Sequence, residues 1–137
     1  MFAPTEEQCL EAIDSDYSAL RWITHQTERI CLYAVRKNYR ALKWANIQTD
    51  EICLEAIRQH TYAIRWVREP SFDVAASALR KNGMALRFLK TQTDVLCLIA
   101  VQQNGRAMRH VKDKKRFIHR AALKQRRNKT FNGNRVS

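Results

Sequence analysis

A 22-residue unit repeats five times between Thr5 and Lys114, with no insertion or deletion between copies. The copies read TEEQCLEAIDSDYSALRWITHQ, TERICLYAVRKNYRALKWANIQ, TDEICLEAIRQHTYAIRWVREP, SFDVAASALRKNGMALRFLKTQ and TDVLCLIAVQQNGRAMRHVKDK. A unit this short cannot fold alone, because it can bury its apolar residues only against neighbouring copies. The repeat therefore predicts a stacked array with an extended functional surface, which argues against an enzyme built around one pocket.

Each copy opens with the signals that start an α-helix. A Thr or Ser hydroxyl can accept from a backbone N–H of the first turn, and in four copies an acidic residue follows at the positive end of the helix dipole. The opening residues are Thr5, Thr27, Thr49, Ser71 and Thr93.

A second column of the repeat marks where this helix should end. It holds Asp, Asn or His, which tolerate positive φ, and Gly follows it in the last two copies. The column consists of Asp16, Asn38, His60, Asn82 and Asn104. A second helix of about seven residues should follow, held only by packing of residues such as Ala41, Leu42 and Ala45. We predict an all-α fold, an α-solenoid of five helix-turn-helix repeats.

Beyond the repeats, residues 115–127 look like a degenerate sixth copy. Phe117, Ile118, Ala121 and Ala122 recur at helical spacing among basic residues, as a cap with a polar outer face requires. We therefore expect a five-repeat solenoid over residues 1–114, a basic capping helix over 115–127 and a basic tail without periodicity over 128–137.

The repeat resembles a bacterial and viral family of helical repeats of unknown function, built on T-x-E-x-C-L-x-A-V-x-x-N-G-x-A-L-x-x-V. The similarity covers residues 5–112 and is closest in Thr93–Val111 and Thr27–Trp44. The fourth copy departs from the pattern at Ser71, Ala75 and Ala76. The resemblance implies a helical array of phage, large-virus or bacterial origin, and it implies no activity.

The formal net charge of +12 is unevenly distributed along the chain. The first copy carries −4, whereas residues 115–137 carry +8, which predicts an acidic partner near the C-terminal end. No basic, apolar leader opens the chain, and no apolar run approaches the roughly 20 residues of a membrane helix. We expect a cytoplasmic, reducing location, in the host cell if the protein is viral, with no membrane partner.

The sequence contains no pattern typical of a catalytic, metal or cofactor site. Cys9, Cys31, Cys53 and Cys97 share one apolar repeat position, and ligands 22 residues apart in successive layers cannot converge on one metal. Neither a metal-type His spacing nor a Gly-rich phosphate loop is present. We expect buried, reduced thiols, no cofactor, no metal and no small-molecule substrate.

Two columns of basic residues are candidate binding rows. The first, which we call the basic row, is occupied in all five copies and should face solvent on the second helix: Arg21, Lys43, Arg65, Arg87 and Arg109. The second lies on the first helix and comprises Arg36, Arg58 and Arg80. Both rows could equally be a solvated face that keeps the array soluble. The cap adds Arg116, Arg120, Lys124, Arg126 and Arg127.

An aromatic row follows the basic row by one residue. Its members are Trp22, Trp44, Trp66, Phe88 and, as a titratable exception, His110. Aromatics interleaved with Arg can stack unpaired bases, as in proteins that bind single strands. The row also adjoins the buried Ala and Leu positions, so we expect packing at the edge of the core.

Taken together, these features favour a non-enzymatic protein that docks on a polyanion, RNA or DNA within a nucleoprotein assembly, through the basic rows and the basic C-terminus. The alternative is an adaptor or inhibitor of phage, viral or bacterial origin that binds an acidic protein or nucleoprotein complex of a host. A cluster of acidic residues in the first copy favours this alternative, since it would repel a nucleic acid there: Glu6, Glu7, Glu11, Asp14 and Asp16.

Overall fold

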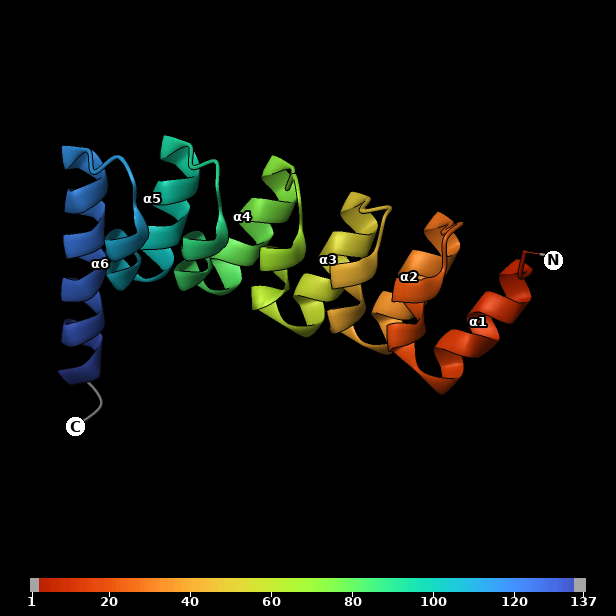
Figure 1. The fold of residues 1–137 in the computed structure, drawn as a ribbon. Coiled ribbons are helices and arrows are strands. Elements are labelled where there is room, and N and C mark those ends of the chain that lie inside the picture. The colour runs from red at the N-terminus through yellow and green to blue at the C-terminus, as the bar shows by residue number, and fades with distance from the viewer. Residues whose placement is uncertain (1–2, 135–137) are drawn as a thin grey trace. The chain divides into compact units, whose positions relative to one another are not determined.

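The computed structural model describes the backbone of residues 3–134 and the side chains of residues 3–130. Every element in this range is helical (Figure 1), and α-helices alternate with short 3₁₀ helices, which we call η1 to η5. The predicted all-α fold of successive helix pairs is therefore confirmed. The pairs are α1 (Glu6–Ser15) with η1 (Tyr17–Trp22), α2 (Glu28–Lys37) with η2 (Tyr39–Trp44), α3 (Asp50–Gln59) with η3 (Thr61–Trp66), α4 (Phe72–Lys81) with η4 (Gly83–Phe88), and α5 (Asp94–Gln103) with η5 (Gly105–His110), followed by α6 (Arg116–Asn134).

The chain forms two compact units, which we call the N-terminal unit (Met1–Val74) and the C-terminal unit (Ala75–Ser137). In the N-terminal unit, α1 packs on α2 and α2 on α3, while η1 and η2 each pack on the α-helix of the following repeat (Figure 1). In the C-terminal unit, η4 packs on α5, and both α5 and η5 pack on α6. Within each unit, neighbouring repeats thus pack on one another, as stacking requires.

The helix starts lie where the repeat predicts them. Thr27 Oγ1 accepts from the N–H of Ile30 at 3.2 Å, and Thr5 accepts from Gln8, whose side chain accepts in return from the Thr5 N–H. The same bond begins the other helices that open a repeat, at Thr49, Ser71 and Thr93. These caps satisfy backbone donors that an isolated helix end leaves free.

The column from Asp16 to Asn104 does not take positive φ, so that expectation is wrong. Its backbone is extended, with φ of −160° at Asn38 and −148° at Asn104, and no described residue has positive φ. Each residue instead joins the two helices of its repeat. Its backbone N–H makes the last hydrogen bond of the α-helix, as Asn38 does to the carbonyl of Ala34. Its side chain accepts from the N–H of the residue two positions later, as Asn38 does from Arg40 at 2.9 Å.

The second helix of each repeat is a six-residue 3₁₀ helix, rather than the helix of about seven residues that we predicted. Its three-residue period places Ala and a Leu-like residue toward the core. In η2, Ala41 and Leu42 are fully buried, while Lys43 is exposed. The 3₁₀ geometry thus presents the basic row to solvent.

Glutamines that the sequence analysis overlooked join neighbouring repeats. Gln26 Nε2 donates to the carbonyls of Leu20, at 3.0 Å, and Trp44, at 2.9 Å, and its Oε1 accepts from the N–H of Asn46. Gln48 and Gln92 repeat this pattern one copy and three copies later. Each side chain therefore bonds backbone groups of the next repeat, 18 and 20 residues further along the chain.

A helix covers the last repeat, and it is longer than predicted. α6 continues past Arg127 to Asn134, so residues 128–134 of the expected tail are helical, and its remainder, 135–137, lies outside the described residues. Ile118 and Ala122 are buried, as a capping helix requires. Among residues 3–134, no helix is long and apolar enough to cross a bilayer.

Candidate nucleic-acid interface

Almost all the excess positive charge lies in the C-terminal unit. Residues 75–137 hold sixteen Lys and Arg against two Asp, a formal net charge of +14, whereas residues 1–74 hold nine against eleven acidic residues, or −2. The two units together account for the +12 of the chain. A positive field of this size attracts polyanions to one part of the molecule.

The strongest concentration of cations lies on α6. The helix contains six Lys or Arg residues and no Asp or Glu. While Ile118 and Ala122 turn toward the repeat, all five cap residues selected from the sequence are exposed: Arg116, Arg120, Lys124, Arg126 and Arg127. The position of the apolar residues therefore leaves the cationic side chains in solvent.

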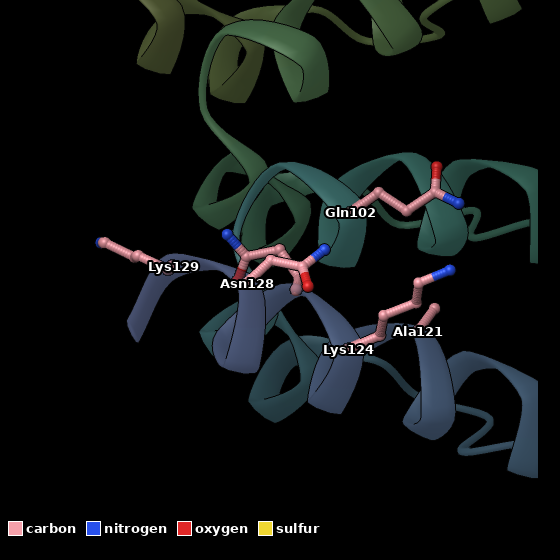
Figure 2. Close-up of a pocket in the computed structure, with 6 residues that line it drawn as sticks. Gln102, Ala121, Lys124, Asn128 and Lys129 are labelled. Atoms are coloured by element: carbon pink, nitrogen blue, oxygen red, sulfur yellow. The ribbon is translucent and has the colours of Figure 1, made fainter. Parts of the chain in front are cut away.

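A polar groove runs between α6 and α5. It is lined by Gln102 of α5 and by Ala121, Lys124, Gln125, Asn128 and Lys129 of α6. Figure 2 shows Ala121 and Lys124 projecting from α6 toward the helix that carries Gln102. Gln125 is held in place, because its Oε1 accepts from the N–H of Gly105 at 2.7 Å. Ammonium and amide groups at a fixed helix junction suit contacts to phosphate oxygens.

The acidic residues of the C-terminal unit are engaged by a lysine outside this groove. Lys115 Nζ lies 2.8 Å from Asp94 Oδ2 and 3.7 Å from Asp113 Oδ2. The hydrogen bond that Lys115 donates to Asp94 raises the pKa of Lys115, which therefore stays charged. Lys115 thus contacts both Asp side chains of the unit, and α6 itself contains no Asp or Glu.

The basic row is exposed at all five positions, as predicted. Three members, Arg21, Lys43 and Arg65, belong to the N-terminal unit, and two, Arg87 and Arg109, to the C-terminal unit. Several of these cations lie over the aromatic residue that follows them. The distances from the charged group to the ring centre are 4.6 Å for Arg21–Trp22, 5.9 Å for Lys43–Trp44, 4.2 Å for Arg65–Trp66 and 4.7 Å for Arg87–Phe88. Contacts of this length are cation–π interactions.

The second row is exposed, but two of its members already contact carboxylates. Arg58 makes two hydrogen bonds to Glu55, at 2.8 and 3.2 Å, and Arg36 lies 3.9 Å from Glu51. The Arg58 guanidinium lowers the pKa of Glu55. Arg80 is exposed at the end of α4. Arg36 and Arg58 would have to give up these contacts to bind a polyanion.

The aromatic row packs at the edge of the core at four of its five positions. Trp44, Trp66, Phe88 and His110 are half-buried, which confirms the expectation for them. Trp22 is 74% exposed, so the expectation is wrong there. Burial and the neighbouring Arg109 and Arg87 lower the pKa of His110, which favours its neutral form.

The acidic residues of the first repeat mostly bind cations of the second. Arg29 Nη1 lies 3.8 Å from Glu6 and 3.5 Å from Glu7. Asp14 accepts from Lys37 Nζ at 2.8 Å and from the Tyr33 hydroxyl at 2.5 Å, and these bonds lower its pKa. Asp16, which caps η1, accepts from Ser18. A structural role within the array thus explains most of this acidic cluster, whose remaining member, Glu11, is exposed.

The four cysteines are buried free thiols, as predicted, and Ala75 takes their place in the fourth repeat. Burial raises the pKa of Cys31 and Cys97, and raises that of Cys53 to about 11, so these thiols are poor nucleophiles. Within the described part of the chain, no three His, Cys, Asp or Glu side chains gather as metal ligands would.

No protein-family model matches this chain, and no match was found among curated proteins or solved structures. The resemblance of the repeats to the bacterial and viral family therefore stays a prediction.

Proposed function

We propose that this protein docks on the phosphate backbone of a nucleic acid through its C-terminal unit, without catalysing a reaction. The main support for this proposal is the composition of α6. This helix exposes five of its basic residues beside a polar groove and contains no acidic residue. Phosphate contacts release condensed counterions and are insensitive to sequence. The protein would therefore bind tightly at low salt and discriminate little between sequences.

The basic row extends this proposal beyond α6. Arg87 and Arg109 lie in the same unit and face solvent. Arg36 and Arg58 contribute less in this proposal, because docking would first break their contacts with Glu51 and Glu55. The rival function, an adaptor that binds a host protein, loses support because Glu6, Glu7 and Asp14 are used within the array.

A salt titration of binding tests the proposal. Replacing Arg120, Lys124 and Arg127 with Gln should flatten the slope of log affinity against log salt by roughly 2 to 3 units on duplex DNA, since each phosphate contact contributes about 0.9. The same titration with Arg65, Arg87 and Arg109 replaced by Gln tests the basic row. A matched control replaces three paired cations, Arg36, Lys37 and Arg58, with Gln and should leave the slope nearly unchanged.

Two outcomes would contradict the proposal. Equal loss of slope in the α6 variant and in the control would show that only total charge matters. Absence of binding by the wild type to duplex and single-stranded RNA and DNA at low salt would exclude a nucleic-acid partner. Recovery of the protein from nuclease-treated extracts with one stoichiometric host protein would then favour the adaptor.

A further inference from the structure

The N-terminal unit exposes an aromatic residue, Trp22, at a repeat position that contacts a tyrosine ring in the next two copies. Trp22 is 74% exposed, although exposing an indole forfeits the favourable burial of a large apolar surface. The corresponding residues of the next two repeats are covered by a tyrosine of the preceding repeat. Tyr17 lies 6.4 Å from Trp44 between ring centres, and Tyr39 lies 6.1 Å from Trp66.

Trp22, at the corresponding position of the first repeat, is instead left largely in solvent. A planar ring therefore contacts this repeat position in the second and third copies, while the first leaves most of its ring in solvent. The Arg21 guanidinium lies over the Trp22 ring at 4.6 Å, and the high exposure shows that most of the indole surface remains accessible.

A groove beside Trp22 is lined by cationic and polar residues of the kinds that bind the phosphate and the base edge of a nucleotide. It is lined by Arg21, Ile23, Thr24, Gln26, Lys43, Trp44 and Asn46. Arg21 lies between the two indoles, because its guanidinium is also 5.9 Å from the centre of the Trp44 ring. Lys43 approaches the same Trp44 ring at 5.9 Å. Arg21, Lys43 and the Trp44 indole thus line one groove, and the Trp22 ring lies beside it, 4.6 Å from the Arg21 guanidinium.

We infer that this groove, which we call the Trp22 groove, binds an unpaired base of a single-stranded nucleic acid. The base would stack on the open surface of Trp22, while Arg21 and Lys43 contact the adjoining phosphate. Thr24 and Asn46 place a hydroxyl and an amide beside the base edge. Stacking and cation–π contacts of this kind occur in proteins that bind single strands.

The inference rests on the proposed docking of a nucleic acid, and it specifies the form of that ligand. Bases in a duplex are stacked on each other and cannot reach Trp22, whereas those of a single strand can be splayed onto a side chain. The N-terminal unit has a net charge of only −2, so phosphate attraction alone would not hold a strand there. Base stacking supplies the missing affinity.

The test compares two single strands with the same phosphates, oligo(dT) and an abasic oligonucleotide of equal length, using the full chain. The wild type should bind oligo(dT) about tenfold or more tightly, given the usual worth of one stacked base. Trp22→Ala should bring this ratio close to one without changing affinity for the abasic strand, and Trp22→Phe should retain most of the ratio. Phe72→Ala removes an aromatic that is 50% exposed in the same unit and should have no effect.

The two strands separate failure of the groove from failure of the proposed function. Tight binding of both strands with equal affinity would overturn the Trp22 groove and leave backbone docking intact. A preference for oligo(dT) that survives Trp22→Ala would place base stacking elsewhere and also overturn it. Failure of the wild type to bind either strand would overturn both proposals.

Discussion

At Gly83, in the fourth repeat, the neighbouring helix α5 comes too close for a side chain. A Cβ atom there would lie 2.2 Å from the carbonyl oxygen of Ala100. The same position holds Tyr39 in the second repeat, whose N–H donates to Gln59 Oε1 much as the Gly83 N–H donates to Gln103 Oε1. Glycine is therefore needed for close approach, and not for positive φ.

Replacing Gly83 with Ala should destabilise the C-terminal unit by about 1 to 3 kcal/mol, the usual range for forcing an extra carbon into a packed contact. Thr61→Ala alters the same repeat position in the third repeat and is the matched control, since it adds no atom. Urea denaturation followed by circular dichroism measures both. An unchanged midpoint for Gly83→Ala would show that α5 moves away from η4 without cost.

Gln48 should be more sensitive to change than an ordinary polar residue. Gln48→Ala removes the partners of two carbonyls and one N–H and should cost about 2 kcal/mol. Gln48→Glu should cost more, because a carboxylate cannot donate to the carbonyls of Leu42 and Trp66 and repels them. Gln102→Ala, at an exposed position, provides the control. Equal denaturation midpoints for Gln48→Glu and the control would contradict this role.

At the scale of helices, local signals were predictable and the contacts between repeats were not. The caps at Thr5 and Thr27 follow from residues three positions apart, which the sequence displays directly. The expectation of positive φ at Asn38 was wrong because Asn is common both at positive φ and as the N-cap of a following helix. Gln48 recurs visibly, but its acceptors include a carbonyl 18 residues away that only stacking brings near.

The residues of the candidate sites also divide into those that the sequence predicts and those that depend on contacts between repeats. The exposure of Arg21 and Lys43 could be predicted from periodicity, because the opposite side of the same short helix holds buried Ala and Leu. The exposure of Trp22 could not, since its column is aromatic in four copies and nothing in it distinguishes Trp22 from Trp44 and Trp66, which a tyrosine of the preceding repeat contacts. The boundary between the two units was also hidden, because the repeat stays in register through α4.

The inner face of α6 should determine whether the last repeat stays folded. Placing Asp at Ile118 or Ala122 should destabilise the protein by roughly 2 kcal/mol or more, because each position is buried and burying a charge is costly. Leu123→Asp introduces the same charge at an exposed position of the same helix and should change stability little. Thermal unfolding distinguishes them. Equal melting temperatures for all three variants would mean that α6 does not cap the array.

Across the whole molecule, the excess positive charge lies in the C-terminal unit, whereas the 74% exposed Trp22 lies in the N-terminal unit. The C-terminal unit carries +14 but its aromatic row ends in the half-buried His110, whereas the N-terminal unit is close to neutral and carries Trp22. Phosphate attraction acts over roughly a Debye length, while stacking requires contact. The C-terminal unit would thus capture any nucleic acid, and the N-terminal unit would distinguish single strands from duplexes.

Acetylation of lysines on the intact protein, read by mass spectrometry, should reveal this division. Duplex DNA at low salt should protect Lys124 and Lys129 of α6 and leave Lys43 as reactive as in the unbound protein, because a paired base cannot enter the Trp22 groove. Oligo(dT) should protect all three. Lys37 is exposed but bonded to Asp14, and its reactivity should not change with either ligand. Protection of Lys43 by the duplex as strongly as by oligo(dT) would contradict the division, since it would mean that phosphate contacts alone bring nucleic acid to the N-terminal unit.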